Sequence, residues 1–575
     1  RSDAGAFTFA ASGLALADGR VSLDGRFGES RWSVDADLRS LRLSGLRALA
    51  ARWVQLPATL TAEAGIGGRV RASGGGATAT LVNVDLSTSD LNFTNEEGTL
   101  VAEKVAAELA GTVRLLRDGP MIDARLSSKT GQALAGPVLL DFGVNPLRLD
   151  VKGALNGESI ALRETSLELQ GLVDARGEAE IALRPAFAIR TARLTVEQLR
   201  FPAAYTSFMQ LALAGTDFGT LETSGAISGA LEIAANQLER LEARLADLDL
   251  EDTKGKFSMH DVRGAVHWGR DPKTSSAASH LEWSSGSAYG LSGGASRVDF
   301  RASGLEFELT RPARLPIFDG ALRVRSLAAR KIGTPQAEVD FDAVIEPISM
   351  PLLSRAFGWP EMSGRLSGSI PGLTYRNRVL SVQGDVQAQV FDGTITGRNF
   401  RLQDPLGPWP RLFADITARS LDLALVTRTF SIGSITGRLD GDVQRLELFN
   451  WSPIAFDARL SSTPNDRSPH RISQKAVTSI SSIGSGSGGG VAKTLQSGVL
   501  RFFDEFNYDR IGIACRLRNE VCLMSGIDRQ GIGYYIVKGR GIPRIDIIGS
   551  TGRVDWPQLV SQIVAGMRSE GVQFR

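Results

Sequence analysis

The sequence predicts a mainly β protein that grows by internal repetition and carries only a few short helices. Apolar and polar residues alternate with a period of two over much of the first 460 residues, which is typical of half-buried strands. The 63 glycines fall mostly between these alternating segments, where turns are expected. A chain of 575 residues is long for one compact core, whereas a repeat protein lengthens without enlarging its core.

The strongest observation is a gap-free repeat, in which residues 318–373 recur as residues 391–446. Phe-Asp-Gly stands at residue 318 and again at residue 391, and Gly-Arg-Leu stands at residue 364 and again at residue 437. The differences 391 − 318 and 437 − 364 both equal 73. Chance similarity rarely keeps one register over such a length, so we interpret the pair as a duplicated structural unit.

Each copy predicts several strands that bury one face, with a short helix between them. Pro351 to Phe357 suits one or two helical turns that cap a sheet. The alternating apolar residues of the two copies are the candidate lining of an apolar face. They are Val339, Phe341, Ala343, Ile345, Val382, Val386, Val390, Ile416, Leu421 and Leu423.

Residues 1–460 form one repetitive region in this interpretation. Within it, Phe201 to Leu213 has helical spacing and precedes glycine-rich strand residues, which predicts a third, diverged copy of the unit. Leu238 to Leu250 fits both a helix and a strand with a one-residue slip. We favour a strand with a β-bulge, because its neighbours are predicted strands.

The composition changes after residue 460. Residues 461–494 combine a polar loop, a short helix and a Gly/Ser-rich tract. Residues 495–575 predict a helix, a hairpin, two strands and a final helix for which Asp555 is a plausible N-cap. The apolar faces expected for the two helices comprise Leu495, Val499, Phe502, Phe503 and Phe506 in the first, and Leu559, Val560, Ile563 and Met567 in the second.

The only two cysteines, Cys515 and Cys522, flank the predicted hairpin turn. A two-residue turn at Arg518-Asn519 would place them directly opposite each other, at a separation that a disulfide can bridge. The alternative is a pair of reduced, buried thiols. A disulfide would indicate an oxidising compartment.

Charge and motifs argue against several classes of function. The net charge of +2 lacks the clustered basic excess of a nucleic-acid binder. The glycine tract at 484–490 matches a dinucleotide fingerprint only formally, since no buried strand precedes it. The four histidines lack metal-ligand spacing, and no acid–base pair stands out. We therefore expect no enzyme, no cofactor and no metal site.

The repeat, the Gly437 to Val443 turn and the C-terminal block resemble the AsmA-like superfamily of envelope proteins, in particular its YdbH-like branch. The resemblance is strongest from Ile435 to Leu559, where it includes Trp451-Ser-Pro-Ile-Ala-Phe-Asp and Tyr534-Tyr-Ile-Val-Lys-Gly. It implies an elongated β-groove, an open, taco-like β-solenoid with an apolar interior. It also implies transport of phospholipids across the periplasm from the inner to the outer membrane, and no catalytic residues.

No run of 18 apolar residues occurs, so we expect no membrane span in this chain. Residue 1 is arginine, and we expect a segment of a longer protein whose inner-membrane anchor lies outside it. An outer-membrane partner at the C-terminal sheet edge is a further expectation. The alternative function is an envelope scaffold that recruits partners by β-strand addition.

Overall fold

The computed structural model describes residues 2–3, 6–45, 61–75, 78–117, 119–184, 187–272, 277–359, 361–405, 407–484, 503–531 and 533–561. In these residues the chain is mainly β, and one large antiparallel sheet contains many strands. The chain divides into two compact units, unit 1 (residues 1–284) and unit 2 (residues 285–575). The boundary lies inside residues 1–460, for which the sequence predicts one repetitive region.

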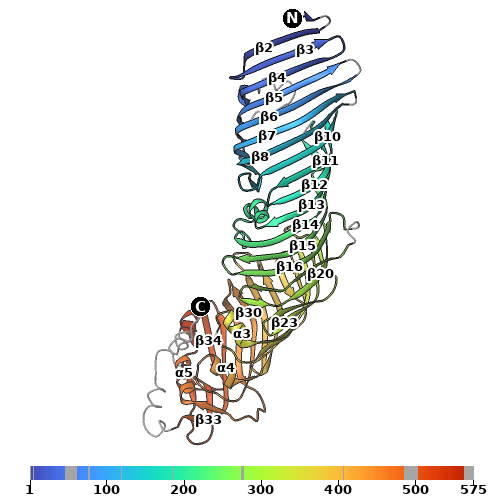
Figure 1. Ribbon diagram of the computed structural model, residues 1–575. Helices are drawn as coiled ribbons and strands as arrows, with labels where there is room; N and C mark the ends of the chain where they lie inside the picture. The colour runs from blue at the N-terminus through green and yellow to red at the C-terminus, as the bar shows by residue number, and fades with distance from the viewer. Residues whose placement is uncertain are drawn as a thin grey trace. The chain divides into compact units, whose positions relative to one another are not determined.

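Unit 1 is built from long strands that follow one another in chain order, as Figure 1 shows for β2 to β8 and β10 to β16. Each strand pairs antiparallel with its successor, except that β10 pairs with β8 across the short β9. The strands are β1 (Ser2–Asp3), β2 (Ala6–Leu16), β3 (Gly19–Gly28), β4 (Trp32–Arg42), β5 (Thr61–Gly75), β6 (Thr78–Thr94), β7 (Leu100–Leu116), β8 (Gly119–Ala135), β9 (Val138–Asp141), β10 (Leu147–Asn156), β11 (Ser159–Leu169), β12 (Val173–Ala182), β13 (Ala188–Phe201), β14 (Leu221–Ala234), β15 (Gln237–Asp252), β16 (Phe257–Gly269) and β17 (Ser279–Trp283).

The hydrophobic core of unit 1 gathers at the helical segment that follows β13. This segment comprises η1 (Tyr205–Met209), a π-helical turn, and α2 (Gln210–Leu213). The helical prediction is confirmed for residues 203–213, whereas Phe201 ends strand β13. Fully buried Leu172 and Ala204 pack there with Phe142. The predicted bulge in β15 is also confirmed, because its register against β16 shifts between Leu245 and Leu248.

Among the residues described, unit 2 has shorter strands, three short helices, and the start of a final helix at residues 556–561. The three short helices are α3 (Met350–Ala356), α4 (Leu423–Thr429) and α5 (Gln474–Gly484). Its strands are β18 (Ser285–Ala288), β19 (Leu291–Gly293), β20 (Ser296–Ser303), β21 (Glu306–Leu309), β22 (Ala313–Ile317), β23 (Gly320–Arg330), β24 (Glu338–Ser349), β25 (Arg365–Arg376), β26 (Val379–Val382), β27 (Val386–Val390), β28 (Gly393–Gln403), β29 (Arg411–Asp422), β30 (Arg438–Phe449), β31 (Ser452–Ser462), β32 (Arg471–Ser473), β33 (Glu505–Arg518), β34 (Val521–Gly526), β35 (Arg529–Gln530), β36 (Gly533–Gly539), β37 (Ile547–Gly549) and β38 (Arg553–Asp555).

The sequence repeat is also a repeat of structure. Strands β22, β23, β24 and β25 and helix α3 have counterparts in β27, β28, β29 and β30 and helix α4, and every bound shifts by the offset of the sequence repeat. The strand registers shift by the same amount, since Leu322 faces Ile345 in the first copy and Ile395 faces Ala418 in the second. Two stretches of chain therefore build the same pairing pattern from different side chains.

The largest core of unit 2 lies where its helices meet the C-terminal strands. It includes fully buried Val477 of α5, Ile547 of β37 and Cys522 of β34. The turns of the repeat contribute side chains to this core. Phe318 and Phe391 take left-handed φ angles of 50° and 52°, Phe391 is buried in the core, and Phe318 packs against it. The Phe-Asp-Gly motif is thus a turn that also inserts an aromatic side chain.

Candidate functional site

The two faces of the unit 1 sheet differ in chemistry. One row of directly paired residues crosses ten strands from β6 to β16 without a polar side chain. Leu109 exposes 38% of its surface, and Leu126 and Leu149 beside it are half-buried, so the row is partly open to solvent. Its members are Leu86, Leu109, Leu126, Leu149, Leu167, Ala175, Val196, Gly229, Ala243 and Val266.

Unit 2 has an apolar row of the same kind, which runs from β22 to β34. Ile345 of the predicted lining belongs to it. Because paired residues in an antiparallel sheet share a face, this row marks one continuous apolar face of unit 2. Its members are Leu315, Leu322, Ile345, Gly368, Ala388, Ile395, Ala418, Gly441, Leu460, Ile513 and Gly526.

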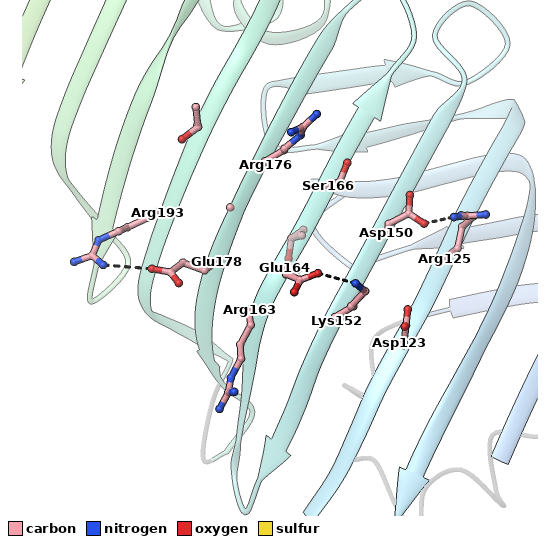
Figure 2. A pocket seen from close by; sticks show the side chains of 13 residues that line it. Asp123, Arg125, Asp150, Lys152, Arg163, Glu164, Ser166, Arg176, Glu178 and Arg193 are labelled. Carbon is pink, nitrogen blue, oxygen red and sulfur yellow. Dashed lines mark hydrogen bonds and ion pairs between the residues drawn. The ribbon is translucent and has the colours of Figure 1, made fainter. Parts of the chain in front are cut away.

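The opposite face of unit 1 carries ion pairs that bridge neighbouring strands. Figure 2 shows this face around a hollow of about 730 Å³ on β8 to β13. Three pairs cross its strands, namely Lys152–Glu164 at 2.7 Å, Arg125–Asp150 at 2.5 Å and Arg193–Glu178 at 3.3 Å. The Lys152 ammonium, through its hydrogen bond, holds the pKa of Glu164 below its ordinary value. The charges in these three pairs neutralise one another. The hollow is therefore part of a solvent-exposed series of cross-strand ion pairs, and its charged groups do not point together toward one ligand position.

The feature that best fits a ligand is an apolar cavity of about 370 Å³, lined mainly by the second copy of the repeat and also by Ile370 and Leu373 of β25 in the first copy. No lining residue has a polar side chain. The volume lies within the range of small-molecule sites, about 300–1,000 Å³. Its lining comprises Ile370, Leu373, Val382, Val386, Ala388, Ile395, Gly397, Phe400, Leu412, Ala414, Ile416 and Leu446.

The ten predicted lining residues separate into three groups. Val382, Val386 and Ile416 line the cavity. Val339, Phe341 and Ile345 are half-buried positions of β24, and Ala343 on the same strand exposes only 1%. The remaining three are enclosed in the core beside the helices and line no open surface. They are Val390, Leu421 and Leu423, of which Leu423 opens helix α4 instead of continuing a strand.

Cys515 and Cys522 form a disulfide, with 5.6 Å between their Cα atoms. The predicted hairpin register is wrong: the turn lies one residue later than predicted, so each partner on the second strand shifts by two positions. Leu517 faces Cys522, and Cys515 faces Met524, so the cysteines are diagonal neighbours on one face. The turn is Asn519-Glu520, at left-handed angles of 48° and 60°, as a tight hairpin turn requires.

The helix predicted across residues 495–506 is wrong at its described end. Phe506 lies on β33 and is 2% exposed, because it alternates with buried Tyr508 along that strand. Phe503 precedes the strand and is not helical. The other three residues predicted for this helix lie outside the described residues. They are Leu495, Val499 and Phe502.

The final helix begins where the sequence predicts it. The Asp555 carboxylate accepts a hydrogen bond from the Gln558 N–H at 2.9 Å, which is the bond of an N-cap. Leu559 is 4% exposed, whereas Val560 exposes 37% and so faces away from the core. Ile563 and Met567 lie outside the described residues.

Sequence patterns missed a buried polar cluster at the loop before β32. Burial raises the pKa of Asp466, but hydrogen bonds from Ser468, the Arg438 N–H and His470 outweigh this, so its pKa falls to about 2. Tyr508 donates a hydrogen bond to the Thr436 carbonyl at 2.5 Å. Burial raises the pKa of Tyr508 well above its ordinary value. These hydrogen bonds hold the loop against β30 and β33, so we assign the cluster a structural role.

Other site classes find little support in the described ranges. These ranges bring together no group of three histidine, cysteine, aspartate or glutamate residues that could hold a metal ion. None of the helices placed by the structure has the length and apolar content to cross a membrane. The chain matches no model of a known protein family, and it matches no curated protein.

Proposed function

We propose that the apolar faces bind the acyl chains of phospholipids, and that the protein carries phospholipids between the inner and outer membranes of the envelope. The observation that carries this proposal is the unbroken apolar row in each unit, backed in unit 1 by a face of paired charges. An acyl chain gains about 0.8 kcal/mol for each methylene group that leaves water. Headgroups would stay in solvent at the border of the sheet.

Movement along such a face follows from its repetition. Neighbouring strands offer similar apolar contacts along the row, as Leu126 of β8 and Leu149 of β10 do. A chain that shifts by one strand, about 4.8 Å, therefore exchanges one set of contacts for an equivalent set. The barrier to each step is then small compared with the free energy of leaving the face altogether.

The disulfide supports a periplasmic location for the proposed activity, because disulfides persist in oxidising compartments. Attachment to the inner membrane and a partner at the outer membrane belong to the same proposal. The protein would act without chemical catalysis, as a surface that shields lipid tails from water.

The test is to purify the chain without detergent, extract it with organic solvent and identify lipids by mass spectrometry. We expect several phospholipids per chain, reduced in Val386→Asp and Phe341→Asp, because a carboxylate on the apolar face opposes the acyl chain. Gln387→Asp is the matched control, since Gln387 neighbours Val386 on the opposite face of β27 and is exposed. A folded, lipid-free wild-type protein would refute the proposal and favour the scaffold that acts by strand addition.

A further inference from the structure

The two copies of the repeat differ at one row of three paired residues. In the first copy the row is Ala313, Val324 and Ala343, in which one branched residue stands between two alanines. In the second copy the row is Val386, Gly397 and Ile416. The order of side-chain sizes is therefore inverted: the first row is small, large, small and the second is large, small, large.

Solvent exposure follows this inversion. Ala313, Val324 and Ala343 expose 4%, 5% and 1% of their surface. Their three counterparts in the second copy are all half-buried and line the apolar cavity. The same register thus produces a filled surface in the first copy and a notch in the second, and Gly397 is part of the lining of the notch.

A second position enlarges the notch. Phe341 on β24 of the first copy corresponds to Ala414 on β29 of the second, at the offset shared by the whole repeat, and Ala414 lines the cavity. An aromatic side chain is thus replaced by a methyl group where the cavity lies.

We infer that the second copy of the repeat contains a dedicated site for one acyl chain, a fixed station on an otherwise uniform apolar face. This inference rests on the proposed function, and it names the place where a lipid tail is held longest. The first copy, whose equivalent row is filled, would be only a passage. The site is set by Gly397 and Ala414, which act by being small.

The size of the cavity favours a single hydrocarbon chain over a protein partner. Twelve residues line it, whereas a standard protein interface takes about 20–30 residues from each side. A helix with its side chains is about 10–12 Å across, so even one helical turn occupies more space than the cavity of about 370 Å³ offers. The lining also offers no side-chain hydrogen bond that would orient a polar ligand.

The backbone permits the site to be closed by substitution. A Cβ atom built on Gly397 meets nothing nearer than the Val386 carbonyl oxygen, at 3.9 Å. Valine also favours strands, and the first copy already carries Val324 at the equivalent position. Gly397→Val should therefore fold while it fills the notch, and Ala414→Phe should fill the same cavity from β29.

The experiment uses a phosphatidylethanolamine that carries a diazirine in one acyl chain, with cross-linked peptides mapped by mass spectrometry on the full chain. In the wild type we expect the strongest labelling on β28 and β29. Gly397→Val and Ala414→Phe should each lower it about tenfold, which corresponds to about 1.4 kcal/mol. Val324→Gly should raise labelling on β23 and β24, because it opens the equivalent notch in the first copy.

Thr396→Val is the matched control, because Thr396 precedes Gly397 on the opposite face of β28 and the change keeps side-chain size. Unchanged labelling in Gly397→Val and Ala414→Phe would overturn the inference while leaving the proposed function intact. An absence of labelling from both apolar faces would overturn the proposed function itself. If a filled variant misfolds by circular dichroism, labelling of Val324→Gly decides the question.

Discussion

Replacing Asp466 with asparagine removes a charge that the surrounding hydrogen bonds favour. The Asp466 side chain is 8% exposed. One carboxylate oxygen accepts hydrogen bonds from the Arg438 N–H at 2.7 Å and the Ser468 hydroxyl at 2.6 Å, and the other accepts from the Ser468 N–H at 2.9 Å. His470 completes the group at 3.2 Å. The charged form is therefore stabilised in the folded protein.

The pKa gives the size of this effect. It falls from 3.8 to about 2 on folding, and each pKa unit corresponds to about 1.4 kcal/mol, so the charge contributes about 2 kcal/mol. Because the folded pKa is depressed, this contribution is complete above about pH 5. It declines as the pH falls from about 4 through 2, where the folded state also binds the proton.

Hydrogen exchange of the amides in β32 and β33 measures the local free energy of opening. Between pH 6 and pH 2.5 we expect the difference between wild type and Asp466→Asn to shrink by about 1–2 kcal/mol. Asp385→Asn is the control, because Asp385 pairs with Arg398 on the surface and such pairs contribute about 0–1 kcal/mol. A difference for Asp466→Asn that does not change with pH would refute the assigned role of its charge.

Three further predictions concern stability in unit 2. Leu517→Ala should cost about 2–5 kcal/mol in urea unfolding, because Leu517 is 0% exposed; Leu523→Ala on the same hairpin, 46% exposed, should change little. Reduction of Cys515–Cys522 should cost about 2 kcal/mol, the loop-closure value for a separation of 7, measured as a shift in midpoint with and without reductant. Asp422→Ala should speed exchange of the α4 amides and cost about 1 kcal/mol, since the Asp422 carboxylate caps that helix at 2.8 and 3.1 Å; unchanged exchange would contradict this.

The repeat made the arrangement of unit 2 predictable in detail. One constant offset in residue number relates both short helices and the strands beside them. Period-two alternation and the Phe-Asp-Gly turns are local signals, which can arise by chance at one place. The duplication shows each of them at two places with the same spacing, which makes the prediction firmer. Apolar spacing predicted the helical segment after β13, and the strand character of its neighbours predicted the bulge in β15.

The errors arose where one pattern fits two structures. Phe502, Phe503 and Phe506 match a helical stripe, yet Phe506 also alternates with Tyr508, and tertiary pairing with β32 and β36 favours the strand. In the hairpin, the turn depends on which two residues take positive φ. Asn519 and Glu520 do so, and glutamate gives no local signal for that conformation.

The cavity could not be found from strand patterns alone, because every lining residue is simply apolar or glycine. Gly397 resembles a turn residue in the sequence, and its position within β28 opposite Val386 and Ile416 depends on register. Comparison with the first copy supplies the missing signal. Where that copy carries Val324 and Phe341, the second carries glycine and alanine.

The duplication also determines how such a protein can change its length. From β25 to β29 the module occupies four positions in the sheet, because β26 and β27 together fill one interrupted position between β25 and β28. Four is even, so the chain leaves the module at the same edge of the sheet at which it entered. Helices α3 and α4 each follow the last strand of a module. Gain or loss of one module would change the sheet by about 19 Å and keep each face on its own side. The length of the sheet can therefore change in steps of one module, while the strand pairing pattern within each module stays the same.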